Sequence, residues 1–372
     1  MKKKNILFTI WSFSYGGGAE KQLANLVNSL DEKKYNIDII EFLHTNKACL
    51  NVNENIKLLN PINNKEKESK IKRKIVNIMI YICPYLVRKK YIKKEYDYEI
   101  SFNYLIPSFL LSNSKSNKKI CWIHGPIWDL KEKKNSYKRF LQRKFFKRAD
   151  KIVAIAEETK KSIENIYPEF KEKIEIIYNG YSFSKMDELC KEYSVERKSK
   201  LELLYCNRFD NNKNPLFLIE VAKLLSEKNI DFHINFLGNG ELRYDMEMLI
   251  RKYNLNKYID ILGYKENPYP YLKSCDLICL TSKSEGFSTI MIEGMHFGKP
   301  FVSTTYAVAN EVREKGCGLL ADEIFEYSKC IEKLYNDTNI IEKMSKNCIN
   351  YSRNFTVDNQ IKKIENIFKG DN

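Results

Sequence analysis

The chain has 372 residues, 43% of them hydrophobic, and a formal net charge of +15, which is enough material for two domains of ordinary size. No apolar run approaches the roughly 18 to 20 residues of a membrane-spanning helix, and the strand-like run that follows the N-terminal lysines is too short for a signal peptide. Ten unpaired-looking cysteines and four dispersed histidines predict a cytoplasmic protein without a structural metal.

The first half alternates strand-like and helix-like segments. Strands are predicted at residues 5–10, 36–42, 98–102, 119–123, 151–156 and 174–178. A glycine loop at 16–18 leads from the first strand into a helix over 19–30, and the turn dipeptide Asn179-Gly180 ends this half. Strands that alternate with helices predict a parallel, doubly wound sheet.

The pattern restarts after a charged stretch at 185–200. Strands are predicted at 201–206, 231–237, 259–262, 277–281 and 300–303, with helices between them such as 215–228 and 242–253. The predicted fold class is therefore α/β, with two tandem Rossmann-like domains, 1–178 and 179–354, that face each other across a ligand cleft. The final helical stretch, within 355–372, is compatible with packing on either domain.

Two glutamates eight residues apart, Glu285 and Glu293, lie in the segment Ser-Glu-Gly-Phe-Ser-Thr-Ile-Met-Ile-Glu-Gly-Met at 284–295. A strand precedes this segment and a helix is predicted over 288–295, so the motif straddles a strand-to-helix turn. At roughly 1.5 Å of rise per residue, the two carboxylates would lie on the order of 10 Å apart, with unpaired helix N–H groups between them. Helix starts attract phosphate and carboxylates accept hydrogen bonds from hydroxyls. The motif therefore predicts a site for a sugar nucleotide.

The positive excess lies entirely in the first half, where residues 1–178 hold 36 Lys and Arg against 20 Asp and Glu, compared with 27 against 28 in 179–372. This asymmetry suggests anionic lipid or nucleic acid as a partner. No nucleic-acid-binding motif is recognisable, so we expect no nucleic acid. Two segments, 65–94 and 131–151, are both basic and aromatic. The apolar run at 75–87 suits either the bilayer interface or a core helix with solvated lysines beside it.

Short motifs are spread over most of the chain. In order, they are Gly-Gly-Ala-Glu at 17–20, Ile-His-Gly at 123–125, Tyr-Asn-Gly at 178–180, Asn-Arg-Phe at 207–209 with Lys-Asn at 213–214, Gly-Asn-Gly at 238–240, Asp276, the two-glutamate segment, Gly-Lys-Pro at 298–300 and Gly-Cys-Gly-Leu at 316–319. Their order and spacing together resemble the family 4 glycosyltransferases, retaining enzymes of the GT-B fold. Three positions depart from the family pattern: Asn207 and Ser288 replace common glycines, and Gly294 replaces the usual alanine.

The resemblance implies roles for individual residues. Catalytic candidates are His124, beside the transferred sugar, and Glu285, on the hexose hydroxyls. Glu293 is expected to bind the ribose hydroxyls, and Arg208 and Lys213 the donor diphosphate. The remaining donor-binding candidates are Gly17 and Gly18 near the phosphates, the backbone amides of Phe287, Ser288 and Thr289 on the diphosphate, and Tyr264 and Lys265 beside the base.

The resemblance also implies a reaction. A hexosyl or N-acetylhexosaminyl unit would move with retention from a nucleoside-diphosphate sugar, with a UDP-sugar favoured, to a glycan hydroxyl, without a cofactor or metal ion. Because the positive charge lies in the acceptor domain, we expect a polyprenyl-diphosphate-linked acceptor on the anionic inner face of the plasma membrane, in surface polysaccharide synthesis. Two alternatives stay open: a nucleotide-sugar epimerase of the same fold, and a non-catalytic basic protein that binds a polyanion.

Overall fold

The computed structural model describes residues 2–46, 50–283 and 288–370, and it divides into two compact units. The first unit is Met1–Gly180 together with Val357–Asn372, and the second is Tyr181–Thr356. The domain boundary was expected after residue 178, and the structure divides two residues later, after Gly180. The final helix belongs to the first unit, so the chain passes into the second unit and then returns.

The first unit is built on a parallel sheet with the strand order β4-β2-β1-β6-β7-β8-β9. Its strands are β1 (Lys4–Ile10), β2 (Tyr35–Glu41), β4 (Ile56–Leu58), β6 (Tyr98–Ser101), β7 (Lys118–Ile123), β8 (Lys151–Ala154) and β9 (Ile174–Ile176). A separate pair consists of β3 (Leu43–His44) and β5 (Asn63–Asn64). The strand order reverses between β1 and β6, where doubly wound sheets bind ligands at the carboxyl ends of the strands.

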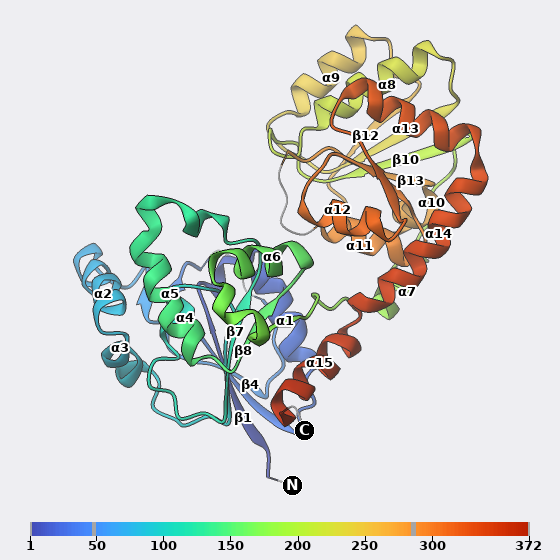
Figure 1. Cartoon of the computed structure of the whole chain (residues 1–372). Coiled ribbons are helices and arrows are strands. Elements are labelled where there is room, and N and C mark those ends of the chain that lie inside the picture. The colour runs from blue at the N-terminus through green and yellow to red at the C-terminus, as the bar shows by residue number, and fades with distance from the viewer. Residues whose placement is uncertain (1, 47–49, 284–287, 371–372) are drawn as a thin grey trace. The chain divides into compact units, whose positions relative to one another are not determined.

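Helices cover both faces of this sheet, with α1 and α15 on one face and α2 to α5 on the other (Figure 1). The helices are α1 (Gly18–Ser29), α2 (Lys70–Ile82), α3 (Pro84–Tyr91), α4 (Ile106–Phe109), α5 (Ser136–Arg148), α6 (Glu157–Ile166) and α15 (Val357–Lys369). Four 3-10 turns complete the unit: η1 (Phe13–Tyr15), η2 (Trp128–Lys131), η3 (Lys133–Asn135) and η4 (Pro168–Lys173). Phe368 of α15 stacks on Tyr98 of β6, with the ring centroids 4.0 Å apart.

The second unit repeats the arrangement, with the parallel strand order β12-β11-β10-β13-β14-β15. Its strands are β10 (Leu201–Cys206), β11 (Phe232–Leu237), β12 (Ile259–Gly263), β13 (Leu277–Leu280), β14 (Phe301–Ser303) and β15 (Gly318–Leu320). Its helices are α7 (Phe183–Leu189), α8 (Pro215–Glu227), α9 (Arg243–Lys252), α10 (Tyr269–Ser274), α11 (Thr289–His296), α12 (Ala307–Glu314), α13 (Ile324–Asn336) and α14 (Thr338–Ser352), followed by η5 (Arg353–Phe355).

The predicted α/β class, with two doubly wound parallel sheets, is confirmed. The central strands are apolar on both faces because helices cover both, and β10, β11 and β13 are almost completely buried. The order of the second sheet reverses between β10 and β13, which marks the ligand end of this unit. No helix in the described ranges is long and apolar enough to cross a bilayer.

Candidate functional site

The loops that follow β10 and β13 are joined at the point where the strand order reverses. The hydroxyl of Thr281 donates to the carbonyl oxygens of Lys213 and Asn214, at 2.8 and 2.9 Å. The backbone N–H of Lys283 donates to the carbonyl oxygen of Asn212 at 2.8 Å. The loop that carries Arg208 and Lys213 therefore lies directly beside the chain that leads into the two-glutamate segment.

Asp210 organises the loop after β10. One of its carboxylate oxygens accepts from the backbone N–H groups of Asn212 and Lys213, at 3.0 and 2.8 Å. The other oxygen lies 3.2 Å from the guanidinium of Arg208. The Arg208 side chain is still 73% exposed, so it is oriented by one carboxylate and keeps N–H groups available to an incoming anion.

Two glycines let the loop after β11 approach the loop after β10. A Cβ atom on Gly238, which has φ +143°, would lie 1.9 Å from the carbonyl oxygen of Asn207, and one on Gly240 would lie 2.3 Å from that of Phe209. Only glycine fits at these two positions. The Gly-Asn-Gly motif thus holds the Arg208 loop in place.

Glu293 lies on α11, is partly buried, and is close to Cys206 at the carboxyl end of β10. The hydroxyl of Tyr269 donates to its Oε1 at 3.4 Å. Burial raises the pKa of Glu293 to about 7, against a small opposing effect of Tyr269. Burial and the nearby charge of Glu293 both raise the pKa of Cys206, the last residue of β10. The carboxylate and the Arg208 loop therefore meet at the same end of the sheet.

Ser288 and Thr289 form the start of α11. Ser288 is the N-cap residue, and its hydroxyl is buried without a hydrogen-bond partner among the described residues. Thr289 is exposed at the first position of the helix. Glu285 and Phe287 lie outside the described residues, so their predicted roles stay predictions.

Tyr264 and Lys265 follow β12 at the edge of the second sheet. The carbonyl oxygen of Gly263 accepts from the backbone N–H of Gly238 at 2.9 Å, which joins this loop to the Gly-Asn-Gly loop. Tyr264 is 75% exposed, so its ring is open to stacking by a flat ligand rather than packed in the core. Its predicted place beside the base remains a prediction.

In the first unit, the loops after β1 and β6 are also joined. The backbone N–H of Trp11 donates to Oδ1 of Asn103 at 3.0 Å. His124, directly after β7, lies against Phe102 with the ring centroids 4.2 Å apart. Its Nε2 atom has no hydrogen-bond partner among the described residues. Burial lowers the pKa of His124 to about 3, so the imidazole is neutral at physiological pH.

Gly17 is the N-cap residue of α1, and Gly18 is the first residue of that helix. A Cβ atom on Gly17 would lie 2.6 Å from the carboxylate of Glu20, whereas one on Gly18 would meet nothing within 4 Å. Burial raises the pKa of Glu20, and hydrogen bonds from the backbone at Glu20 and Gly17 lower it in part. The carboxylate of Glu20 therefore lies at the start of α1, the helix start that is expected to approach the donor phosphates.

Comparison with known proteins agrees with this geometry. The Glycosyltransferase Family 4 model matches residues 16–185, and the Glycosyl transferases group 1 model matches residues 188–355. The chain belongs to the glycosyltransferases. This glycosyltransferase is 32% identical over 211 residues to an uncharacterized glycosyltransferase of Methanocaldococcus jannaschii, a match that spans 54% of this chain and about half, 52%, of that relative.

Another relative matches nearly the whole glycosyltransferase. It is the GalNAc-alpha-(1->4)-GalNAc-alpha-(1->3)-diNAcBac-PP-undecaprenol alpha-1,4-N-acetyl-D-galactosaminyltransferase of Campylobacter jejuni, which is 25% identical over 360 residues and 92% of each chain. Among solved structures, Anabaena HepE in complex with UDP has a TM-score of 0.75 at 16% identity, with 98% of this chain and 99% of that chain covered. The structural likeness establishes the GT-B fold.

Sequence patterns did not single out three residues that shape the sites of this glycosyltransferase: Asp210, Tyr269 and Glu20. Asp210 is three residues before Lys213, a spacing that suits a turn whose carboxylate binds backbone N–H groups. Glu20 is the third residue after Gly17, the spacing of a helix-capping glutamate. No local signal links Tyr269 to Glu293. In the described ranges, no three His, Cys, Asp or Glu side chains gather as a metal site.

Proposed function

We propose that this glycosyltransferase moves a hexosyl or N-acetylhexosaminyl unit from a nucleoside-diphosphate sugar to a glycan hydroxyl, with retention of configuration. One observation carries the proposal: the Arg208 loop, the start of α11 and the Glu293 carboxylate lie at the same end of the second sheet. Cations and helix N–H groups suit a diphosphate, and a carboxylate suits ribose hydroxyls. A UDP-sugar is the donor that we favour.

The residues have distinct parts in the proposed reaction. The bond between the anomeric carbon and the β-phosphate oxygen breaks while the acceptor oxygen bonds to the same face of that carbon. The acceptor proton passes to the departing phosphate oxygen. Arg208 and Lys213 stabilise the negative charge that grows on the diphosphate, and Glu285 orients the hexose by its hydroxyls. Neither a cofactor nor a metal ion takes part in this scheme.

His124 has a positioning part in the proposal rather than the part of a base. A group with a pKa of about 3 has little affinity for the proton of a sugar hydroxyl at neutral pH. Its Nε2 atom is buried without a hydrogen-bond partner among the described residues, so it would bond to the transferred sugar or the acceptor only if substrate binding exposes it. The low pKa of His124 supports proton transfer to the leaving phosphate.

A polyprenyl-diphosphate-linked glycan is the proposed acceptor, bound by the first unit. The Campylobacter jejuni relative carries a PP-undecaprenol-linked acceptor in its name, and the positive excess of this chain lies in residues 1–178. The enzyme would then work in surface polysaccharide synthesis, as a peripheral protein on the anionic inner face of the plasma membrane.

A thermal-shift screen against a panel of sugar nucleotides tests the donor. The true donor should raise the unfolding temperature because it binds the folded state, and the Glu293→Ala variant should lose most of that rise. Unchanged unfolding temperatures with every sugar nucleotide of the panel would contradict the proposal.

NMR of the product tests the reaction by giving its anomeric configuration. A β-linked product from an α-configured donor would refute retention, and an epimerised sugar from donor alone would favour the epimerase.

A further inference from the structure

Helix α2 has apolar side chains on two opposite sides. Val76 and Ile80 are buried in the core cluster of the first unit. Four isoleucines are exposed instead: Ile71, Ile75, Ile78 and Ile82. Their spacing of four, three and four residues places them along one side of a helix with 3.6 residues per turn. A helix that only covers a sheet needs one apolar side, so this second stripe requires another explanation.

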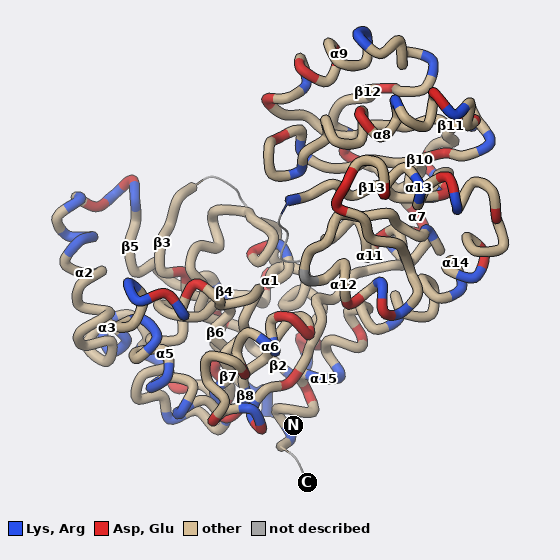
Figure 2. The backbone as a smooth tube through the Cα atoms, turned by 45° about the horizontal axis from the view of Figure 1, so that its top comes forward, with Lys and Arg blue, Asp and Glu red and all other residues tan. Residues whose placement is uncertain are grey.

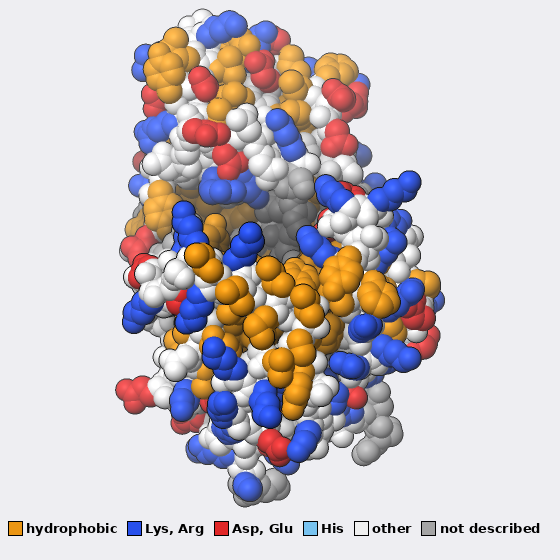
Figure 3. Space-filling view, turned by 90° about the vertical axis from the view of Figure 1, so that its left-hand side faces the viewer, with side chains coloured by type: hydrophobic (Ala, Val, Ile, Leu, Met, Phe, Trp, Pro, Cys, Tyr) orange, Lys and Arg blue, Asp and Glu red, His pale blue; other side chains and the backbone are white. Residues whose placement is uncertain are grey.

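Neighbouring helices extend the stripe into a face. Core side chains of α2, α3 and α5 belong to the same buried cluster. Helix α2 contacts α3, and α4 contacts both α2 and α5. The exposed apolar residues that they add are Met79 on α2, Tyr85 and Leu86 on α3, and Tyr137 and Phe140 on α5. Figure 3 shows the hydrophobic side chains gathered over this part of the first unit, with Lys and Arg among and around them. We call these nine residues the apolar face.

The helices that form the apolar face carry only positive charge. None of α2, α3 and α5 contains Asp or Glu, and each contains at least three Lys or Arg (Figure 2). On α2, Lys70 and Lys74 directly precede Ile71 and Ile75 of the isoleucine stripe in the sequence. An exposed apolar surface of this extent is unusual for a soluble monomer and marks a binding surface. Its basic surroundings indicate an anionic partner.

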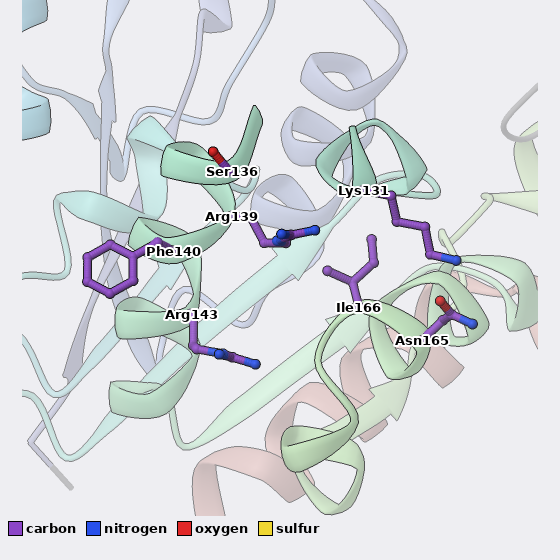
Figure 4. Close-up of a pocket in the computed structure, with 7 residues that line it drawn as sticks. All are labelled: Lys131, Ser136, Arg139, Phe140, Arg143, Asn165 and Ile166. Carbon is purple, nitrogen blue, oxygen red and sulfur yellow. The ribbon is translucent and has the colours of Figure 1, made fainter. Parts of the chain in front are cut away.

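A cationic cavity of about 370 Å³ adjoins the apolar face, between α5, α6 and η2. Arg139 and Arg143 of α5 and Lys131 of η2 line it, together with Phe140, which also belongs to the apolar face (Figure 4). Glu169 pairs with Arg143 at 2.6 Å and offsets its charge, so Lys131 and Arg139 leave the cavity with a net positive charge. A lipid phosphate or another small anionic headgroup suits this lining.

We propose that the apolar face lies on an anionic lipid bilayer. The isoleucines and aromatic rings enter the boundary between headgroups and acyl chains, and the surrounding Lys and Arg contact lipid phosphates. A second copy of the chain fits less well, because two such faces would bring like charges together. Nucleic acid would leave the isoleucines in water. The biological role of this docking rests on the proposed function, because docking would bring the enzyme to an acceptor that is held in the membrane.

Vesicle flotation with the full-length protein tests the docking. The protein should float with phosphatidylcholine vesicles that contain phosphatidylglycerol, more weakly with phosphatidylcholine alone, and less at high salt. The double variant Ile71→Ser with Ile82→Ser should lower the partition coefficient on the order of tenfold. Both side chains are 74% exposed, so the unfolding temperature should stay unchanged. Tyr244→Ser, on exposed α9 of the second unit, is the matched control and should float normally.

Three results would overturn the inference: equal flotation with neutral and anionic vesicles at low salt, wild-type flotation of the serine variant, or a dimer that the serine substitutions dissociate. Lys131→Gln with Arg139→Gln should reduce the preference for anionic vesicles. Donor thermal shifts, measured on the same proteins, keep the two proposals apart. A protein that floats but binds no sugar nucleotide refutes the proposed function alone. A protein that binds a sugar nucleotide but does not float refutes the docking alone.

Discussion

The hydroxyl of Thr281 lies 2.8 Å from the carbonyl oxygen of Lys213, and this contact joins the two loops at the point where the second sheet reverses its strand order. Thr281 is buried, so water does not replace its hydrogen bond. The Thr281 side chain therefore joins the loop of Arg208 and Lys213 to the chain after β13, beside the backbone bond from Lys283 to Asn212. The sequence motifs gave no sign that the Arg208 loop and the chain after β13 are connected.

Thr281→Val tests this connection. Valine keeps the side-chain shape but removes the hydroxyl donor. The carbonyl oxygens of Lys213 and Asn214 keep their bonds from the Tyr205 hydroxyl and the Phe217 backbone N–H, so the free energy of unfolding should fall by only about 0.5–1.5 kcal/mol. Donor affinity should fall as well, because the Arg208 loop loses its anchor. Urea unfolding and donor titration measure the two effects. Thr281→Ser keeps the hydroxyl and should restore most of both, and equal losses in both variants would contradict the role of the hydrogen bond.

Glu293→Gln should change the pH dependence of stability. Burial raises the pKa of Glu293 from its ordinary value of 4.5 to about 7, so the folded state favours the protonated form. Its contribution to stability is complete below pH 4.5 and is lost as pH rises through 7, on the order of 3 kcal/mol in total. Glutamine stays neutral and removes this loss. Unfolding temperatures should therefore favour the variant increasingly from pH 5 to pH 8.

Donor binding by the same variant should move in the opposite direction. A carboxylate accepts hydrogen bonds from ribose hydroxyls more strongly than a neutral amide does. We therefore expect weaker donor binding by Glu293→Gln at pH 8, with the difference from wild type shrinking toward pH 6. A pH-independent difference in stability, or unchanged donor binding, would contradict the assignment.

Arg208→Ala and Lys213→Ala should each impair turnover more than folding. Both residues are proposed to stabilise the departing diphosphate, so kcat/KM should fall on the order of a hundredfold. The exposed Arg208 side chain contributes little to the fold, so its unfolding temperature should stay near that of wild type. Arg251→Ala, on exposed α9, is the control for loss of one surface cation. Wild-type turnover by both variants would show that Arg208 and Lys213 do not stabilise the departing diphosphate.

Gly294→Ala should destabilise the second unit. A Cβ atom at this position would lie 1.8 Å from Cδ1 of Ile278 on β13, and overpacking of this kind costs about 1–3 kcal/mol. Ile278→Val removes that Cδ1 atom, so it should lower stability alone yet rescue Gly294→Ala. Urea unfolding of the two single variants and the double variant gives the coupling energy. Additive effects would show that the two side chains do not meet.

Most long elements could be predicted from the sequence. The apolar run at 201–206 coincides with β10, and the final helical stretch expected within 355–372 is α15, Val357–Lys369. Buried parallel strands carry continuous apolar runs, which makes them easy to locate. The edge strand β4 has only three residues, two of them exposed, and β3 and β5 have two residues each, so no periodicity marked them. Their presence depends on pairing with neighbouring strands.

The sequence motifs predicted which residues form the candidate site, but they did not predict most of the contacts between its side chains. Arg208, Lys213 and the start of α11 were placed at strand ends by their position after apolar runs. The partnership of Tyr269 with Glu293 joins two helices and leaves no local pattern. The carboxylate of Glu20 beside Gly17 was also not expected from the Gly-Gly sequence, and the contact of Gly17 with phosphate stays a prediction. The departure at Gly294 has a packing reason, the proximity of Ile278.

The return of α15 has a consequence for biosynthesis. Phe368 covers Tyr98 with nearly parallel rings, yet 270 positions separate them and all of Tyr181–Thr356 is translated in between. Domains ordinarily fold as they emerge from the ribosome. Here the ring of Tyr98 lacks its stacking partner until Phe368 has been translated.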